Sequence, residues 1–311
     1  MSLVRPELVA AGHIVQETIY FPDNTVGPVL GSPPAYSLVT AAKLGTHTGL
    51  VTKIGDDFPQ ALLKPFDQAR VDTSGIYYGG QSTCSELIYD KNGNKEIRFP
   101  SRAETIAAED FPPIYHGCRM VYVCTMQDDI PLDSLGEVAG IGLESAIDLG
   151  GYGGVHMSKQ KRSKIGDLAG FALEAASHFN FVKASDEDCR TIFGEGEARD
   201  FAAILMAAKA KATLITRGSA GVTIGTAEGC WQVPALKGEP VDVTGGGDAF
   251  MGGFLSEYIR CGKVLESAVF GSATALCVIE KTGGVTPSRM PGRDEVCGRI
   301  PEDFMQSISA V

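Results

Sequence analysis

The sequence predicts an α/β protein in which a mostly parallel central sheet lies between two layers of helices and a small antiparallel sheet projects from it. Two observations support this prediction. Short β-rich runs alternate with amphipathic stretches along most of the 311 residues, and such alternation favours a parallel sheet with helices on both faces. Between residues 75 and 100 the alternation gives way to three short strand-like runs, which are typical of antiparallel hairpins.

Apolar spacing, and the glycines that end many of the runs, define the individual elements. Leu8–Ala11 is expected to form the first strand, and 262–281 two helices near the end of the chain. Other helices are expected over 34–44 and 59–70, and other strands over 49–53, 120–124, 145–149, 179–183 and 213–216. No internal repeat or linker interrupts the chain, so residues 1–311 are expected to form one domain.

The small sheet is expected to combine residues of about 17–31 with those of about 75–100. Its strands within the second segment are placed at 75–78, 84–90 and 95–99, with a hairpin turn at Lys91–Asn94. A small sheet beside a parallel one suits a lid that shields a reaction from water. A surface flap without a gating role is the alternative.

Composition excludes several classes of protein. The formal net charge is -11, which argues against binding to nucleic acid through the phosphate backbone. No apolar run approaches the about 18 residues that a membrane helix needs. The eight cysteines are scattered singly and the five histidines show no metal-ligand spacing, so a reducing, cytoplasmic location is expected.

The run from Val241 to Phe250 carries the strongest chemical signal. It holds three consecutive glycines and then Asp248, ahead of an amphipathic helix-like stretch. Glycine lets the backbone approach a ligand closely, and the start of a helix is a ready anion site. A turn that serves packing alone explains the run less well, because glycine costs helix stability unless it is needed.

This arrangement predicts phosphoryl transfer. A carboxylate beside a bound anion repels it, so Asp248 is expected to accept the proton of an attacking hydroxyl. The N–H groups of Gly245, Gly246 and Gly247 are expected to stabilise the charge on the transferring group.

Two other phosphate motifs are not present. The sequence has no G-x-x-x-x-G-K-[ST], and the run Gly150–Gly154 lacks the third glycine of G-x-G-x-x-G. Asp148 ends the strand before that run, where open α/β sheets bind ligands. It fits a ligand group and a turn former equally well.

The run Asp-Val-Thr-Gly-Gly-Gly-Asp-Ala-Phe at 242–250 resembles the D-x-T-G-A-G-D signature of the ribokinase-like (PfkB) sugar and nucleoside kinases. Further similar segments follow in the family's order at 12–17, 29–45, 54–58, 71–75 and 216–221. The resemblance implies a ribokinase-like three-layer α/β/α fold with a β lid. It also implies that ATP and Mg²⁺ are used to phosphorylate a hydroxyl group.

The resemblance assigns roles by position. Asp248 matches the catalytic base and Gly245, Gly246 and Gly247 the anion hole. The residues matched to the nucleotide side are Thr216, Gly218, Gly221, Thr244 and Lys183, and those matched to the substrate side are Glu17, Gly31, Ser32 and Tyr36. Asp242, with Thr244, matches a position that holds a monovalent cation, such as K⁺, in some members.

Several positions depart from the family pattern. The usual first-strand aspartate is Glu17, and the N-x-x-E pair that organises Mg²⁺ is replaced by Ser185 and Asp188. A hydroxyl and a shorter carboxylate can still hold metal-bound waters. Lys183-Ala-Ser185 and Tyr36 resemble the inositol-kinase branch. A tyrosine at the position of Tyr36 also occurs in some nucleoside kinases of the family.

These observations predict an ATP-dependent kinase of a small sugar or cyclitol, because the Glu17 carboxylate can accept two hydroxyl hydrogen bonds. A nucleoside kinase is the alternative, with Tyr77, Tyr78 and Phe99 as aromatic surface for a base. A non-catalytic member that binds nucleotide or sugar is the third reading, which Asp248 disfavours. In relatives the lid strands pair into dimers, so the resemblance implies a homodimer through the lid.

Overall fold

The computed structural model describes residues 4–91 and 95–311. The strands of its large sheet are β1 (Leu8–Ala11), β4 (Thr48–Ile54), β5 (Asp72–Tyr78), β8 (Met120–Cys124), β9 (Glu144–Asp148), β10 (Phe181–Ser185), β11 (Ala212–Thr216), β12 (Val222–Thr226), β13 (Gly229–Val233) and β14 (Ser309–Ala310). Those of its small sheet are β2 (Val15–Tyr20), β3 (Thr25–Gly31), β6 (Cys84–Tyr89) and β7 (Lys95–Ser101). The helices are α1 (Pro33–Lys43), α2 (Lys64–Ala69), α3 (Leu135–Ala139), α4 (Lys159–Arg162), α5 (Leu168–Ala176), α6 (Asp186–Phe193), α7 (Ala198–Met206), α8 (Gly246–Cys261), α9 (Val264–Ile279) and α10 (Arg293–Arg299).

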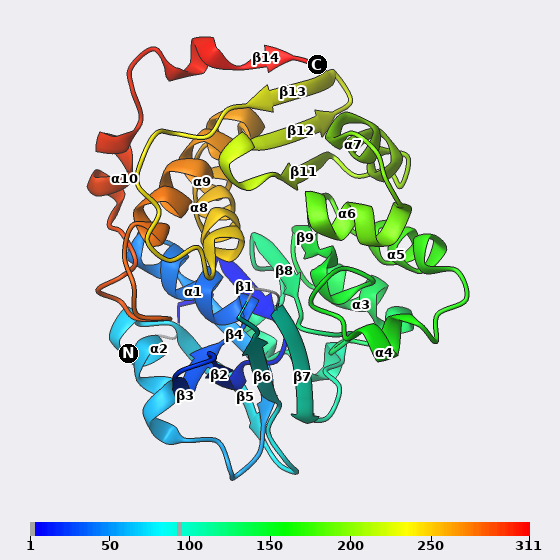
Figure 1. Ribbon diagram of the computed structural model, residues 1–311, viewed down its shortest axis with the longest axis vertical. Helices are drawn as coiled ribbons and strands as arrows, with labels where there is room; N and C mark the ends of the chain where they lie inside the picture. Colours follow the sequence, from blue (N-terminus) through cyan, green and yellow to red (C-terminus); the bar gives the residue numbers. More distant parts are fainter. Residues whose placement is uncertain (1–3, 92–94) are drawn as a thin grey trace.

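The large sheet has the strand order β14-β13-β12-β11-β10-β9-β8-β1-β4-β5 (Figure 1). Every neighbouring pair from β11 to β5 is parallel, and the pairs from β11 to β14 are antiparallel. The prediction of a mostly parallel sheet is therefore confirmed. Strand β1 lies between β4 and β8, so the chain leaves the centre of the sheet in both directions, and ligands bind outside the carboxyl ends of strands at such a point.

Helices cover both faces of this sheet, as the alternation of strands and helices predicted. Successive strand residues point to opposite faces. Leu8 and Ala10 of β1 belong to a core with α1, α2, α8 and α9, whereas Val9 and Ala11 belong to a second core with α3, α5, α6 and α7. Figure 1 shows these two groups of helices on either side of the strands.

The end of the chain differs from the prediction of two helices over 262–281. Gly262 ends α8 in the left-handed conformation, and a single helix, α9, follows. Gly271 does not interrupt α9, because its missing side chain allows close packing against α8. A Cβ there would lie 2.8 Å from the Phe250 carbonyl oxygen. The described residues contain no helix long and apolar enough to cross a bilayer.

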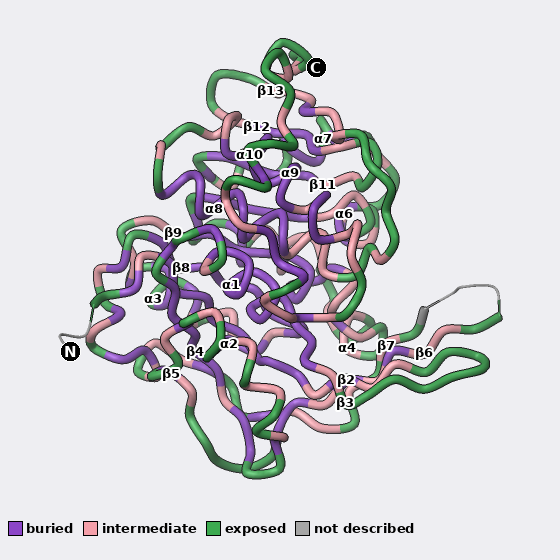
Figure 2. The backbone as a smooth tube through the Cα atoms, turned by 90° about the vertical axis from the view of Figure 1, so that its left-hand side faces the viewer, coloured by how far each residue is buried: buried purple, intermediate pink, exposed green. Residues whose placement is uncertain are grey.

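The small sheet has the order β3-β2-β6-β7. Its outer pairs β2–β3 and β6–β7 are antiparallel, as predicted, but the central pair β2–β6 is parallel, so the sheet is mixed. Figure 2 shows these strands projecting from the body, in contrast to the buried strands at the centre of the large sheet. The expected turn at Lys91–Asn94 includes residues 92–94, which lie outside the described residues.

One predicted member of the small sheet belongs elsewhere. Residues 75–78 form part of β5, which pairs in parallel with β4 at the edge of the large sheet. The assignment of 75–78 to the small sheet is therefore wrong. A β-rich run shows that a strand exists, but the partner of that strand depends on contacts between segments far apart in the chain.

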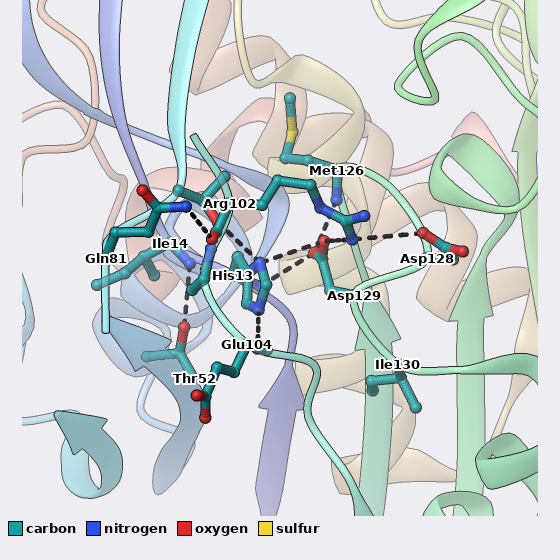
Figure 3. A network of polar contacts seen from close by, with 12 residues as sticks. His13, Ile14, Thr52, Gln81, Arg102, Glu104, Met126, Asp128, Asp129 and Ile130 are labelled. Atoms are coloured by element: carbon teal, nitrogen blue, oxygen red, sulfur yellow. Dashed lines mark hydrogen bonds and ion pairs between the residues drawn. The ribbon is translucent and has the colours of Figure 1, made fainter. Parts of the chain in front are cut away.

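A buried polar network anchors the base of the small sheet to the ends of β1 and β8 (Figure 3). The Asp129 carboxylate accepts from the backbone N–H groups of His13 at 3.1 Å and Met126 at 3.2 Å, and from Arg102 at 3.3 Å. The His13 ring contacts the Glu104 carbonyl at 2.9 Å. A carbonyl only accepts, so this ring nitrogen, Nε2, carries the proton. The network fixes the strands that leave for the small sheet relative to the large one.

Candidate active site

The glycine run forms the start of α8, as predicted. Gly245 adopts φ 75°, and a Cβ on it would lie 2.3 Å from the Tyr36 ring, so both its backbone conformation and its neighbour require glycine. The Gly246 N–H donates to the Val243 carbonyl at 3.1 Å and closes the turn. Gly247 and Asp248 follow in the first helical turn, where N–H groups lack a partner four residues back. Anion binding at this helix start therefore depends mainly on N–H groups other than that of Gly246.

Lys183 brings a positive charge to the start of α8. Its ammonium lies 3.6 Å from the position of a Cβ on Gly247 and pairs with the Asp148 carboxylate at 2.8 Å. Burial lowers the pKa of Lys183, but Asp148, Asp188 and Asp248 outweigh it and raise the pKa overall, so the side chain is charged. Asp148 also accepts from the Gly150 N–H at 2.9 Å, so it is both a turn former and the partner of a site residue.

Asp248 is partly buried in the first turn of α8. Desolvation is the largest effect on its carboxyl group and raises its pKa to about 6. The nearby charges of His156 and Lys183 oppose this rise, whereas Asp148 and Asp188 add to it. A pKa close to neutral suits a group that accepts a proton during a reaction.

Three of the five residues matched to the nucleotide side line one cavity with the glycine run, whereas Thr244 and Lys183 do not line it. This cavity has a volume of about 720 Å³, and its lining includes Thr216, Gly218 and Gly221 at the end of β11 together with Gly246 and Gly247 of α8. Its other wall is apolar and comes from α9 and the segment 235–243. An apolar slot that ends at a helix start has the shape and polarity to hold a planar ring joined to phosphates.

Ser185 and Asp188 form a capping box at the start of α6. The Asp188 carboxylate accepts from the Ser185 N–H and hydroxyl, both at 2.7 Å, and from the Val155 N–H at 2.8 Å. A carboxylate offers roughly four acceptor positions, so one position on its Oδ1 atom remains. This leaves room for contact with a metal-bound water but not for direct ligation through both oxygens. No cluster of three potential metal ligands occurs among the described residues.

His156 is a site residue that the sequence analysis missed. It directly follows Val155, whose N–H donates to the Asp188 carboxylate at 2.8 Å, and its ring lies against Gly150. The missing side chain of Gly150 makes room for this ring, because a Cβ there would lie 2.5 Å from the His156 Nδ1. Within the described structure this buried nitrogen has no hydrogen-bond partner. A lone histidine after a glycine run gives no spacing signal.

The residues matched to the substrate side also lie together. Glu17 on β2 is buried, and its carboxylate accepts from the Ser85 hydroxyl at 3.1 Å. Its side chain is therefore not an exposed carboxylate at the end of a strand. A Cβ on Gly31 would lie 3.2 Å from the Glu17 carboxyl carbon. Ser32 follows with φ 105° at the start of α1, and its buried hydroxyl has no partner within the described residues. Strain and an unpaired hydroxyl at one residue are typical of a ligand site.

Tyr36 connects the substrate side to the glycine run. It is buried one turn after Ser32, and its ring lies against Gly245. Desolvation raises the pKa of Tyr36, and the charges of Glu17, Asp248 and Asp242 contribute to the rise, so all three lie near it. The Arg289 guanidinium lies over the Tyr36 ring at 5.8 Å and opposes the shift.

Aromatic side chains of the small sheet differ from those expected. Tyr77 and Tyr78 lie on β5 and are exposed, so they are not part of the small sheet. Phe99 lines a cavity of about 1180 Å³ between β6, β7 and the segment 155–162. Phe21 and Tyr89 stack with ring centroids 5.3 Å apart. Tyr89 lies four residues after Ser85 on β6. Alternate residues of a strand share a face, so these two side chains lie on the same face of the small sheet.

A cavity of about 720 Å³, the start of α8 beside the Lys183 ammonium, and the partly buried Asp248 therefore lie in one region of the fold. The chain matches the model of the pfkB family of carbohydrate kinases over residues 33–291. It is 31% identical over 284 residues to a cytidine kinase of Thermococcus kodakarensis, covering 89% of this chain and 97% of that protein. This protein therefore belongs to the pfkB family of carbohydrate kinases, which are phosphotransferases with a hydroxyl group as acceptor.

Solved structures agree on the fold. The nucleoside kinase of Methanocaldococcus jannaschii superposes with a TM-score of 0.72 at 22% identity, covering 95% of this chain and 98% of that one. A fructokinase double mutant of Vibrio cholerae, in its fructose-, ADP- and potassium-bound form, superposes with a TM-score of 0.79 at 17% identity. That match covers 97% of this chain and all of the fructokinase chain, at 100%.

Proposed function

We propose that this protein transfers the γ-phosphoryl group of ATP to a hydroxyl group of a ribonucleoside, with Asp248 as the base. The main support is the continuity of the site. The 720 Å³ cavity reaches Gly246 and Gly247, Asp248 follows in the same helical turn, and Tyr36 joins that turn to Glu17. A donor and an acceptor bound at the two ends would meet at Asp248.

The chemistry follows from the charges around that point. The acceptor hydroxyl loses its proton to Asp248 as its oxygen attacks the phosphorus, and the bond to the leaving ADP oxygen breaks. The N–H groups of Gly245 and Gly247 and the Lys183 ammonium stabilise the negative charge on the transferring group. Mg²⁺ held through waters near Asp188 would neutralise the phosphates of ATP.

Two features of the acceptor site favour a ribonucleoside. The Glu17 carboxylate and the unpaired Ser32 hydroxyl suit the neighbouring hydroxyls of a ribose. The stacked Phe21 and Tyr89 offer a flat apolar surface on the small sheet, where a base can stack. The cytidine kinase and the nucleoside kinase among the relatives support the same substrate class.

A sugar or cyclitol is the second candidate. The same pair, Glu17 and Ser32, can accept from and donate to any two neighbouring hydroxyls, and the fructokinase among the relatives acts on a ring without a base. The two candidates differ in their need for the aromatic pair. Replacing Tyr89 by alanine should weaken the binding of a nucleoside substrate and leave the binding of a cyclitol substrate unchanged.

The test is a panel of nucleosides, pentoses, hexoses and inositols with ATP and Mg²⁺, measured for the wild type and Asp248→Asn. We expect turnover with one or more ribonucleosides and a loss of at least about 100-fold in the variant. Turnover of inositols alone would exclude the nucleoside proposal. Equal background turnover in both proteins with every compound would exclude a kinase and favour a binding protein.

A further inference from the structure

Arg289 is a fully buried arginine in the loop between α9 and α10, and the sequence analysis assigned it no role. Its guanidinium donates to backbone carbonyl oxygens of two separate segments. The contacts are Asp242 at 2.9 Å, Thr244 at 3.1 Å, Lys281 at 3.0 Å, Val278 at 3.2 Å and Gly284 at 3.4 Å. It also lies 3.3 Å from the Asp242 carboxylate, which compensates its charge.

A ring of backbone carbonyl oxygens is the environment that a bare monovalent cation requires, because the oxygens replace its water shell. The family resemblance placed such a cation at Asp242 and Thr244. In this structure the carbonyl oxygens of both residues accept hydrogen bonds from Arg289 instead. A metal ion bound by the same oxygens would have to occupy the volume of the guanidinium and face its charge at close range. The residues present therefore do not fit a monovalent cation.

We infer that the Arg289 guanidinium is a built-in replacement for the monovalent cation, and that the phosphoryl transfer proposed above is independent of K⁺. A guanidinium stays charged in proteins and presents five donors in a rigid fork, so it can bridge two loops as a cation would. Unlike a free ion, it cannot dissociate. The inference concerns Arg289 as a positioning residue, and its kinetic part depends on the proposed function.

The peptide geometry shows what Arg289 positions. In a planar trans peptide the C=O and the next N–H point in opposite directions. Since the Thr244 carbonyl points to Arg289, the Gly245 N–H at the start of α8 points away from Arg289. The Asp242 carbonyl fixes the Val243 N–H in the same manner. Arg289 therefore orients N–H groups at the anion site without touching a bound phosphate.

The first measurement needs no variant. Turnover of the best substrate is compared in KCl, NaCl and choline chloride at equal ionic strength, with no other alkali cation present. We expect kcat and KM to agree within about twofold, because the site already holds its cation. A tenfold or larger stimulation by K⁺ over choline would overturn the inference.

The second measurement uses Arg289→Ala, which leaves the carbonyl oxygens around an empty space, with Arg299→Ala as the matched control. Arg299 pairs with Glu280 on the surface and does not contact the 242–245 loop. We expect the melting temperature of Arg289→Ala, without any ligand, to rise by several degrees in KCl relative to choline chloride, since an ion that binds only the folded state stabilises it. The wild type and Arg299→Ala should show no such difference.

In kinetics, Arg289→Ala should lose mainly kcat, with a smaller change in the KM of the acceptor, and K⁺ or guanidinium chloride at millimolar concentration should restore part of it. Arg289→Lys keeps a charge at the site and serves if the alanine variant does not fold; it should retain more activity than Arg289→Met. An equal loss of activity in Arg289→Lys and Arg289→Met would show that Arg289 has a structural role only and would overturn the inference. If the panel finds no substrate, the proposed function fails, while the melting temperatures still decide the role of Arg289.

Discussion

Asp248→Asn is expected to remove catalysis and to stabilise the fold above neutral pH. Asparagine has nearly the shape of aspartic acid but never ionises. In the wild type the carboxyl group is partly buried close to Asp148 and Asp188, and its pKa is raised from 3.8 to about 6. Ionisation of this carboxyl group is therefore less favourable in the folded protein than in the unfolded chain, and it lowers the free energy of unfolding.

The size of this cost follows from the shift. At about 1.4 kcal/mol per pKa unit, a rise from 3.8 to about 6 corresponds to roughly 3 kcal/mol. The side chain is partly solvated, so we expect about 1–3 kcal/mol in practice. For a chain of this length about 2 °C accompanies each kcal/mol, which gives an increase in melting temperature of about 2–6 °C for the variant.

The sign depends on pH. Because the folded-state pKa is raised, the protonated wild type keeps its full stability below about pH 4 and loses it as the pH rises through about 6. The melting temperatures of wild type and variant should agree below about pH 4, diverge between about pH 4 and pH 6, and stay apart at higher pH. The exposed carboxylate in Asp303→Asn is the control and should show no such divergence. A pH-independent difference, or a variant that keeps more than a tenth of the wild-type kcat, would refute the reasoning.

Three further changes test the site and its supports. Gly245→Ala forces a Cβ to within 2.3 Å of the Tyr36 ring at φ 75°, so we expect a loss of about 1–3 kcal/mol in the free energy of unfolding and a large fall in kcat. Lys183→Met leaves the buried Asp148 carboxylate unpaired; chemical denaturation should show a loss of about 3–5 kcal/mol. Asp129→Asn removes an acceptor of the network beneath the small sheet, which should cost about 1–3 kcal/mol and raise KM more than it lowers kcat.

Each of these has a control and a contrary result. Gly298→Ala, on a helix with open space around the new Cβ, should be neutral, and equal effects of the two glycine changes would contradict the role of Gly245. The double change Lys183→Met with Asp148→Leu should recover much of the stability lost by Lys183→Met alone. If it does not, the unpaired charge is not the cause. Asp129→Asn with unchanged KM would show that the network does not position the small sheet for binding.

The sequence predicted those parts of the site that depend on local order. Three glycines and an acidic residue come directly before an amphipathic stretch, which predicted a helix start at Asp248, and the structure has α8 begin there. Of the nucleotide-side residues, Thr216 ends β11, and Gly218 and Gly221 lie in the turn that follows it. The carboxyl ends of parallel strands share one edge of a sheet. Such features can be inferred from a single run of residues.

Contacts between segments far apart in the chain could not be inferred in this way. The strand at 75–78 joins the large sheet because its partner is β4, and its own residues would have suited either sheet. Arg289 donates to the Thr244 carbonyl although it lies 45 residues later in the chain, after α8 and α9. Nothing near Arg289 in the sequence marks it as buried.

The sequence by itself determined the fold class, the helix start with its aspartate, and the order of the nucleotide and substrate segments, because periodicity and glycine placement act over a few residues. Only the tertiary structure decided which charges surround Asp248, that Glu17, Ser32 and Tyr36 are all buried, and that an arginine occupies the place expected for a cation. Burial and charge at a site depend on which distant segments meet there, and that is fixed only when the whole core packs.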